Sequence, residues 1–273
     1  MAPRPVRSAR RSRFTAASAD RHLLYQLSVQ SVDTEAAFLD RVHRRVVGRR
    51  AVSLREDFCG TALLCAEWVR KRPERRATGV DLDPSVLAWG REHNLAPLGD
   101  RADRVTLVQA DVRAPHRGVH DVIVAFNYSY WIFRTRDELR DYFAGVRRAL
   151  APRGLFFCDA YGGTDAMDAL QESRRIRGGF TYVWEQARFN PIDHDVLNHI
   201  HFEFADGSRM DRAFTYAWRF WTLPELQELL REAGFREVTV YWDRAEREGE
   251  ESYRPTTRAA NQPGWLAYLV AQR

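Results

Sequence analysis

Short apolar runs alternate with amphipathic stretches over the first 160 residues of the chain. Strand-like runs lie at 51–58, 77–80, 105–109, 119–126 and 155–159, and helical spacing is found at 23–45, 61–71, 83–93 and 135–150. Such alternation is typical of an α/β domain with a parallel sheet between two layers of helices. The run 119–126 is almost continuously apolar, as expected for a strand in the buried middle of that sheet. We therefore predict a doubly wound, mostly parallel sheet.

After residue 160 the pattern changes to an alternation with a period of two residues. It covers 180–187, 196–204 and 210–219, with turn signals between the segments. This pattern predicts a small antiparallel β insertion at about 175–219. A capped helix at 224–232 and two strands at 237–242 and 264–271 follow, so we assign residues 20–273 to a single domain that carries this insertion.

The charge of the chain is concentrated at its start. The 273 residues are 45% hydrophobic and 12% aromatic, which supports a folded core, and the net charge is +5. Residues 1–13 contain five arginines and no acid, so this stretch accounts for the excess. We interpret residues 1–19 as a flexible Arg-rich tail, with a nucleic-acid arm and a transit peptide as alternatives, and we expect no nucleic-acid partner.

The three cysteines, Cys59, Cys65 and Cys158, are scattered along the chain, as is typical of free thiols in a reducing compartment. No apolar run approaches the roughly 20 residues that span a bilayer. No Cys/His cluster has the spacing of a zinc site. We predict a cytoplasmic protein without a membrane partner or a metal, and we allow for a homodimer.

The candidate chemistry lies where the predicted strands end, because ligands of such sheets bind beyond the carboxyl ends of the strands. In chain order the segments are Cys59-Gly60-Thr61-Ala62, Asp81-Leu82, Asp111-Val112 and the polar-aromatic run 127–131. A turn without bulky side chains lets a ligand approach the backbone, and the helix after it offers N–H groups. A carboxylate at the end of the second strand can bind two ribose hydroxyls. The order therefore predicts a ligand that contains adenosine.

The order and spacing of these segments resemble the class I S-adenosylmethionine-dependent methyltransferases over roughly residues 50–160. Residues 214–242 also resemble the members that act on small molecules. The resemblance implies a seven-stranded Rossmann-like methyltransferase sheet, S-adenosylmethionine as cofactor and a small-molecule acceptor. It implies O- or N-methylation by direct in-line displacement.

The resemblance also assigns residues by position. The cofactor-binding set is Tyr25, Glu56, Cys59, Gly60, Thr61, Asp81, Leu82, Asp111, Val112 and Asn127. The first motif departs from the family pattern, because Phe58 and Ala62 stand where the family has glycine. Asp57 is a second acid beside Glu56, and we favour Glu56 as the partner of the methionine ammonium.

The predicted catalytic residues are Tyr130, Trp131, Asp159 and Tyr161. The aromatic rings would shape a closed site, and Asp159, Tyr161 and His201 are the candidate bases for an acceptor that loses a proton. The predicted acceptor-binding residues are Trp184, His201 and Arg219, of which Arg219 suits a carboxylate.

Three other functions stay open. A nucleic-acid or protein methyltransferase is one, although residues 127–130 lack the prolines common in enzymes that methylate bases. A non-catalytic module that binds S-adenosylmethionine is the second. The third is a nicotinamide oxidoreductase, although its G-x-G-x-x-G fingerprint is missing after the first strand.

Overall fold

The computed structural model describes residues 14–114, 118–243 and 253–273, and the chain divides into two compact units. The antiparallel unit comprises Met1–Gln30, Asp168–Asn190 and Asp195–Ala217. The α/β unit comprises Ser31–Met167, Pro191–His194 and Trp218–Arg273. No helix of the described ranges is long and apolar enough to cross a membrane.

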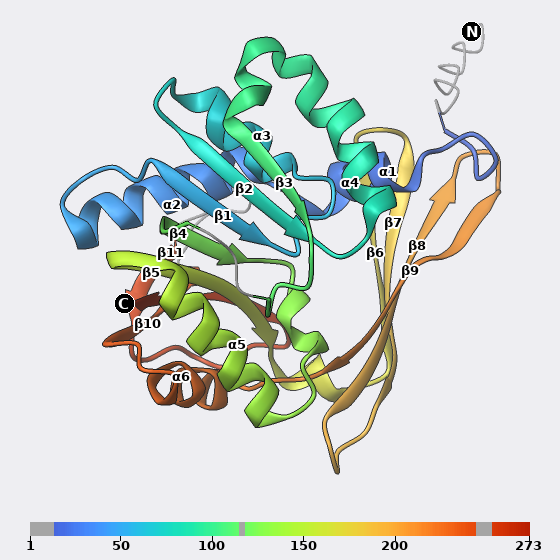
Figure 1. Cartoon of the computed structure of the whole chain (residues 1–273). Helices are drawn as coiled ribbons and strands as arrows, with labels where there is room; N and C mark the ends of the chain where they lie inside the picture. Colours follow the sequence, from blue (N-terminus) through green and yellow to red (C-terminus); the bar gives the residue numbers. More distant parts are fainter. Residues whose placement is uncertain (1–13, 115–117, 244–252) are drawn as a thin grey trace, which may run out of the picture. The chain divides into compact units, whose positions relative to one another are not determined.

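The α/β unit contains an eight-stranded sheet with the order β11-β10-β12-β5-β4-β1-β2-β3 (Figure 1). The strands are β1 (Ser53–Asp57), β2 (Arg76–Asp81), β3 (Val105–Gln109), β4 (His120–Ala125), β5 (Leu150–Gly162), β10 (Glu237–Asp243), β11 (Tyr253–Thr256) and β12 (Trp265–Gln272). The first five are parallel to one another, and β12 is antiparallel to both β5 and β10. The predicted doubly wound, mostly parallel sheet is confirmed. Its eighth strand is β11, an edge strand antiparallel to β10 in a segment that the sequence predicted as a loop.

Helices cover both faces of this sheet (Figure 1). They are α2 (Val32–Val47), α3 (Leu63–Lys71), α4 (Pro84–Gly90), α5 (Arg136–Ala149) and α6 (Leu223–Glu232), with short turns η1 (Arg91–Leu95), η2 (Ala96–Arg104), η3 (Ser129–Ile132) and η4 (Thr164–Met167). Phe38 of α2 and Trp68 of α3 share one core with Phe157 of β5. Phe156, the preceding residue on the same strand, faces the other way and packs on Phe143 of α5, with ring centroids 5.7 Å apart. Strand alternation therefore gives the sheet two apolar faces, one for each helix layer.

The segment predicted as one helix at 23–45 forms two, α1 (Arg21–Val29) and α2. The break lies at Gln30, whose extended backbone (φ −94°, ψ 130°) cannot continue α1. Asp33 and Glu35 then occupy the first turn of α2, where acids stabilise a helix N-terminus. The apolar spacing hid this break because it continues across both helices.

The antiparallel unit is a four-stranded sheet with the order β6-β7-β8-β9, together with α1. Its strands are β6 (Leu170–Ile176), β7 (Phe180–Phe189), β8 (Asp195–Phe204) and β9 (Arg209–Arg219). Leu24 of α1 shares a core with Phe180, Ile200 and Phe202. The sequence predicted three of these strands and missed β6, whose residues are polar and largely exposed.

The predicted tail, residues 1–19, is described only in part, because residues 1–13 lie outside the described ranges. Phe14 is buried and packs edge-on against Phe180, with ring centroids 5.8 Å apart. Ala16 N donates a hydrogen bond to Ser208 Oγ at 3.0 Å. Residues 14–19 therefore form part of the antiparallel unit.

Candidate active site

The carboxyl ends of four parallel strands meet at one edge of the α/β sheet. Asp57 pairs with Val80 and Asp81 pairs with Gln109, so the segments that follow β1, β2 and β3 start side by side. On the other side of β1, Val124 of β4 pairs with Glu56. This parallel pairing gathers the candidate segments 58–62, 81–83, 110–112 and 126–131 at the edge where such sheets bind ligands.

The turn after β1 is left-handed at the two positions where glycine is missing. The backbone angle φ is 57° at Phe58, 51° at Gly60 and 55° at Ala62. Left-handed backbone costs a residue with a side chain about 1–2 kcal/mol, so Phe58 and Ala62 are strained. Hydrogen bonds hold the turn: Cys59 N donates to Val80 O at 3.0 Å, and Ala62 N donates to Cys59 O at 2.8 Å. The departure from the family pattern thus costs strain energy but keeps these positions left-handed.

Two glycines that the sequence analysis did not single out let neighbouring elements approach this turn closely. A Cβ atom at Gly79 would lie 2.8 Å from Cys59 Sγ, and one at Gly90 would lie 2.4 Å from Thr61 O. Asn94 Nδ2 also donates a hydrogen bond to Thr61 O at 2.8 Å. The available signal was a glycine inside a strand and another inside a helix, which often mark close backbone approach.

The two acids at the end of β1 lie in different surroundings. Asp57 accepts hydrogen bonds from Arg55 Nε at 2.6 Å and from Tyr142 OH at 2.9 Å, and all three side chains are buried. Neighbouring residues of a strand face opposite sides, so Glu56 faces α3 instead. There, Glu56 Oε2 accepts from Cys65 N at 3.2 Å and from Cys65 Sγ at 3.1 Å. The geometry favours Glu56 as the carboxylate that a ligand can use.

Burial raises the pKa of Glu56 to about 8, and the nearby negative charges of Glu35 and Asp81 act in the same direction. The hydrogen bonds from Cys65 oppose this shift without cancelling it. A cation beside this carboxyl would lower its pKa and favour the ionised form.

Asp81 connects the end of β2 to the first turn. Its Oδ2 accepts a hydrogen bond from Gly60 N at 2.7 Å, and its Oδ1 accepts one from Asp83 N at 3.0 Å. A carboxylate oxygen has two lone pairs, so each one retains the capacity to accept a hydroxyl group of a vicinal diol. The next residue, Leu82, is 67% exposed and offers a flat apolar contact beside this polar position. Both features fit the ribose and base of an adenosine.

Asp111 and Val112 follow β3. The Asp111 carboxylate forms a bidentate pair with Arg113, with Nε–Oδ1 at 3.0 Å and Nη2–Oδ2 at 2.6 Å. Val112 is buried, and its carbonyl accepts a hydrogen bond from Arg55 Nη2 at 3.1 Å. Arg55 therefore holds the main chain at a predicted cofactor-binding position, a role that was not predicted from the sequence.

The turn after β4 contains two successive left-handed residues, Asn127 (φ 56°) and Tyr128 (φ 57°). Asn127 N donates to Asp159 Oδ2 at 2.8 Å, and Tyr128 N donates to Asp159 Oδ1 at 3.0 Å. Left-handed residues other than glycine cost on the order of 1–3 kcal/mol each, so these bonds hold a strained turn. Tyr130 is fully buried and donates its hydroxyl to the Asp159 carbonyl at 2.8 Å.

Five aromatic rings pack together next to this turn. Trp131 stacks on Tyr161, with centroids 4.8 Å apart at an angle of 29°, and meets Phe220 edge-on at 5.2 Å. Tyr128 lies 4.9 Å from Tyr161, and Trp218 lies 6.2 Å from Trp131. The predicted pair Trp131 and Tyr161 therefore belongs to a larger cluster. The aromatic run at 218–221 was the sequence signal for its other members.

Two predicted site residues belong to the antiparallel unit and contact aromatic side chains there. Tyr25 of α1 lies against Phe214 of β9, with centroids 5.1 Å apart. Trp184 of β7 stacks with Tyr216 of β9 at 6.5 Å and an angle of 28°. Their assignments to the cofactor and the acceptor stay predictions.

His201, also in the antiparallel unit, is buried between two acids. Its Nδ1 lies 2.6 Å from Asp211 Oδ1, and its Nε2 lies 2.8 Å from Glu185 Oε2. The second histidine of this strand, His199, lies 2.9 Å from Thr215 Oγ1 through its Nδ1. No group of three or more His, Cys, Asp or Glu among the described residues could hold a metal ion.

Arg219, predicted to bind an acceptor carboxylate, lies in the α/β unit and contacts its own neighbours. Its guanidinium stacks over the Trp221 ring, 3.8 Å from the centroid. It donates a hydrogen bond to Arg134 O at 3.0 Å and forms an ion pair with Glu225 at 3.3 Å. These contacts hold the guanidinium beside the start of α6.

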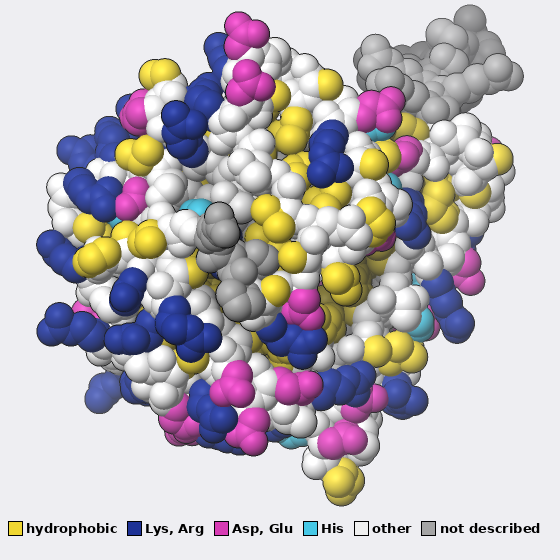
Figure 2. Space-filling model, viewed as in Figure 1, with side chains coloured by type: hydrophobic (Ala, Val, Ile, Leu, Met, Phe, Trp, Pro, Cys, Tyr) yellow, Lys and Arg dark blue, Asp and Glu magenta, His cyan; other side chains and the backbone are white. Residues whose placement is uncertain are grey.

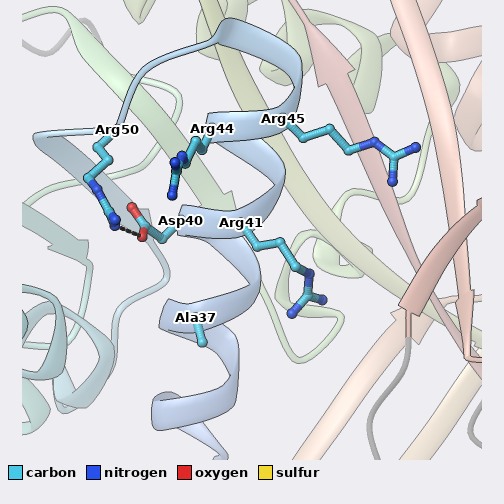
Figure 3. Close-up of a pocket in the computed structure, with 6 residues that line it drawn as sticks. All are labelled: Ala37, Asp40, Arg41, Arg44, Arg45 and Arg50. Atoms are coloured by element: carbon cyan, nitrogen blue, oxygen red, sulfur yellow. Dashed lines mark hydrogen bonds and ion pairs between the residues drawn. The ribbon is translucent and has the colours of Figure 1, made fainter.

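A basic surface recess on α2 contains none of the predicted site residues. It is lined by Ala37, Asp40, Arg41, Arg44, Arg45 and Arg50 (Figure 3). Asp40 pairs with Arg50 at 2.6 Å and with Arg75 at 2.7 Å, and basic residues in the last turn of a helix complement its dipole. Acidic side chains lie among the basic ones on the face in Figure 2. We therefore interpret this recess as the basic end of a helix.

Comparison with known proteins agrees with this geometry. Residues 59–156 match the family model described as a methyltransferase domain. Three solved structures show the similarity of the fold. The amino pentose methyltransferase CalS10 from Micromonospora echinaspora has a TM-score of 0.66 and 20% identity, over 92% of this chain and 95% of that chain. An S-adenosylmethionine-dependent methyltransferase from Clostridium acetobutylicum has a TM-score of 0.67 and 17% identity, over 92% and 96%.

The third structure is the sugar N-methyltransferase KedS8 from Streptoalloteichus sp., with a TM-score of 0.63 and 18% identity over 100% of this chain and 98% of that chain. No curated protein sequence matches the chain. The matched segment is similar to a methyltransferase domain, and most of the chain shares the fold of these S-adenosylmethionine-dependent methyltransferases. The fold predicted from the sequence is thereby confirmed, and the predicted methyltransferase domain is matched over residues 59–156.

Proposed function

We propose that the chain methylates an oxygen or a nitrogen of a small-molecule acceptor with S-adenosylmethionine as donor. The observation that carries this proposal is Asp81, which accepts Gly60 N–H at 2.7 Å and keeps lone pairs for a ribose diol. Glu56 would accept the methionine ammonium, and Asp111 with Val112 would meet the adenine. The remaining proposed cofactor contacts are Cys59, Thr61, Leu82, Asn127 and, from α1, Tyr25.

The bound cofactor supplies a methyl group that is already activated on a sulfonium ion, so the protein has to position the reactants and exclude water. We assign this task to the aromatic cluster around Trp131 and Tyr161. Its faces can also stabilise a cationic centre by roughly 0.5–2 kcal/mol per ring. Burial raises the pKa of the Tyr130 hydroxyl well above its usual value, and this hydroxyl already donates to Asp159 O. We therefore give Tyr130 a structural role and not a role in proton transfer.

For the acceptor, we propose an amino sugar or a related hydroxylated amine. Support comes from two of the structural neighbours, which are an amino pentose methyltransferase and a sugar N-methyltransferase. We retain Trp184, His201 and Arg219 as the proposed acceptor contacts. Tyr161 and His201 stay the proposed candidate bases for an acceptor that must lose a proton, and His201 would first have to release a carboxylate from one of its ring nitrogens.

We further propose a cytoplasmic location, because the three cysteines are free and buried, as a reducing compartment would keep them. We propose no membrane or nucleic-acid partner. The homodimer considered from the sequence stays a proposal, which light scattering of the purified chain would test.

The test of the function is a transfer assay with methyl-labelled S-adenosylmethionine and a panel of amino pentoses, aminohexoses and their hydroxyl analogues. Mass spectrometry should find a methylated product with at least one amine or hydroxyl acceptor. Asp81→Ala should lose this product, while Asp165→Asn, an exposed acid on η4, should keep it. Binding of S-adenosylhomocysteine without turnover of any acceptor would favour a non-catalytic module instead.

A further inference from the structure

We propose that Asp159 is a positioning residue that holds the turn after β4 in the shape needed for methyl transfer. The sequence had suggested this residue as a general base. The inference rests on the proposed function, because that function assigns Asn127 of this turn to the cofactor and the aromatic cluster beside it to positioning the reactants. Asp159 lies near the end of β5, paired with Tyr268 of β12, and is 4% exposed. Its carboxylate is therefore fixed to the sheet and faces the protein interior.

Both carboxylate oxygens bind the turn. Oδ2 accepts from Asn127 N at 2.8 Å and Oδ1 accepts from Tyr128 N at 3.0 Å. Successive N–H groups of a turn form a concavity that binds an anion, and here a carboxylate of the same chain occupies it. Each oxygen keeps a second lone pair, but a general base has to reach the acceptor proton, and the Asp159 side chain is only 4% exposed and faces the protein interior.

The strained backbone of the turn after β4 explains why it needs the two hydrogen bonds to Asp159. Asn127 and Tyr128 are both left-handed, at φ 56° and 57°, and a tyrosine rarely adopts this region without outside support. The rings of Tyr128 and Trp131 belong to the aromatic cluster, so a relaxed turn would move the wall of the proposed acceptor site. The main-chain carbonyl of Asp159 adds a third link, because it accepts the Tyr130 hydroxyl at 2.8 Å.

Two main-chain N–H groups, of Asn127 and Tyr128, partly stabilise the negative charge of the Asp159 carboxylate. Burial raises the pKa of Asp159 to about 7, and the hydrogen bonds from Tyr128 N and Asn127 N lower it from an even higher value. The Tyr130 hydroxyl and the Cys158 thiol interact electrostatically with Asp159, and burial raises the pKa of both. Asp159 is thus the group of this cluster that changes charge near neutral pH.

The first test is the variant Asp159→Asn, whose amide can accept only one of the two N–H groups and sets its own N–H₂ against the other. We expect kcat to fall about 100-fold, the effect of a displacement of about 1 Å at a reacting site. The dissociation constant of S-adenosylhomocysteine should change far less than kcat, because Asn127 is the one proposed cofactor contact that lies in this turn. Asp165→Asn should change neither value.

The second test needs no acceptor and compares the folded wild-type protein with Asp159→Asn. With ¹⁵N-tyrosine labelling, the Tyr128 amide shift should follow a single titration near pH 7, and its exchange with solvent should accelerate at least tenfold in Asp159→Asn. An exchange rate of the Tyr128 amide that is unchanged in Asp159→Asn, or an Asp159→Asn enzyme with wild-type kcat, overturns the inference. A wild-type chain that does not bind S-adenosylhomocysteine would instead refute the proposed function.

Discussion

Glu56 should couple cofactor binding to the release of a proton. Its pKa of about 8 means that about 0.9 of the free protein carries a proton on this carboxyl at pH 7. An ammonium group within about 4–6 Å lowers the pKa of an acid by about 1–3 units, so we expect a value near 6 in the complex. Binding at pH 7 should therefore release about 0.8 proton.

The sign of the pH dependence follows from this release. A ligand whose binding expels a proton binds more tightly as the pH rises, until the free protein has lost that proton by itself. With pKa values of about 8 and about 6, the affinity for S-adenosylhomocysteine should rise about 25-fold between pH 6 and pH 8. Above pH 8 the gain should level off.

The assay is titration calorimetry with S-adenosylhomocysteine at pH 7 in two buffers of different ionisation enthalpy. The difference between the observed heats gives the number of protons released. Glu56→Gln should release none and should lose the pH dependence. Glu67→Gln is the matched control, because Glu67 lies on α3 and pairs with Arg70 and Lys71. Wild-type binding without proton release, or undiminished release in Glu56→Gln, would refute the reasoning.

Three further substitutions, two of them with a control, test local packing inside the α/β unit and inside the antiparallel unit. Gly90→Ala should weaken S-adenosylhomocysteine binding at least tenfold, because the added Cβ would lie 2.4 Å from the Thr61 carbonyl oxygen in the turn after β1. The control is Gly145→Ala, whose Cβ would lie 3.7 Å from its nearest neighbour; it should keep binding and gain up to about 1 kcal/mol in the free energy of unfolding. Ala62→Gly should lower the free energy of unfolding by less than about 0.5 kcal/mol, because relief of the backbone strain offsets the lost methyl group. Ala66→Gly inside α3 should lower it by about 1–2 kcal/mol, and equal losses in denaturant titrations would contradict the strained turn. Asn198→Leu should raise the unfolding free energy by about 1–3 kcal/mol, because neither polar atom of this buried side chain has a partner among the described residues; a lower melting temperature would show that the amide is satisfied in solution.

The fold was predictable where a strand or helix has a regular apolar pattern of its own. β3 was predicted with its observed bounds at 105–109, and the buried run of β4 was correctly assigned to the middle of the sheet. The missed strands β6 and β11 are largely polar, so pairing with neighbouring strands and not their own sequence determines them. The break between α1 and α2 depends on one extended residue, Gln30, inside continuous helical spacing.

The positions of the candidate site were predictable because chain order places Asp81 and Asp111 at one sheet edge. The partners of these residues were not. The choice between Glu56 and Asp57 depends on Tyr142, which binds Asp57 from 85 residues away along the chain. Likewise, the clamp at Asp159 depends on two main-chain N–H groups of a distant turn. Such contacts follow from tertiary packing, which leaves no trace in local spacing.

Titration calorimetry of the wild-type chain with S-adenosylhomocysteine and, separately, with NAD tests the central claim most directly. We expect saturable binding of S-adenosylhomocysteine at one site per chain, with NAD producing no binding heat, because the turn at 58–62 lacks the glycine fingerprint of a dinucleotide site. Binding of NAD without binding of S-adenosylhomocysteine would contradict the assignment of this sheet edge to the methyl donor.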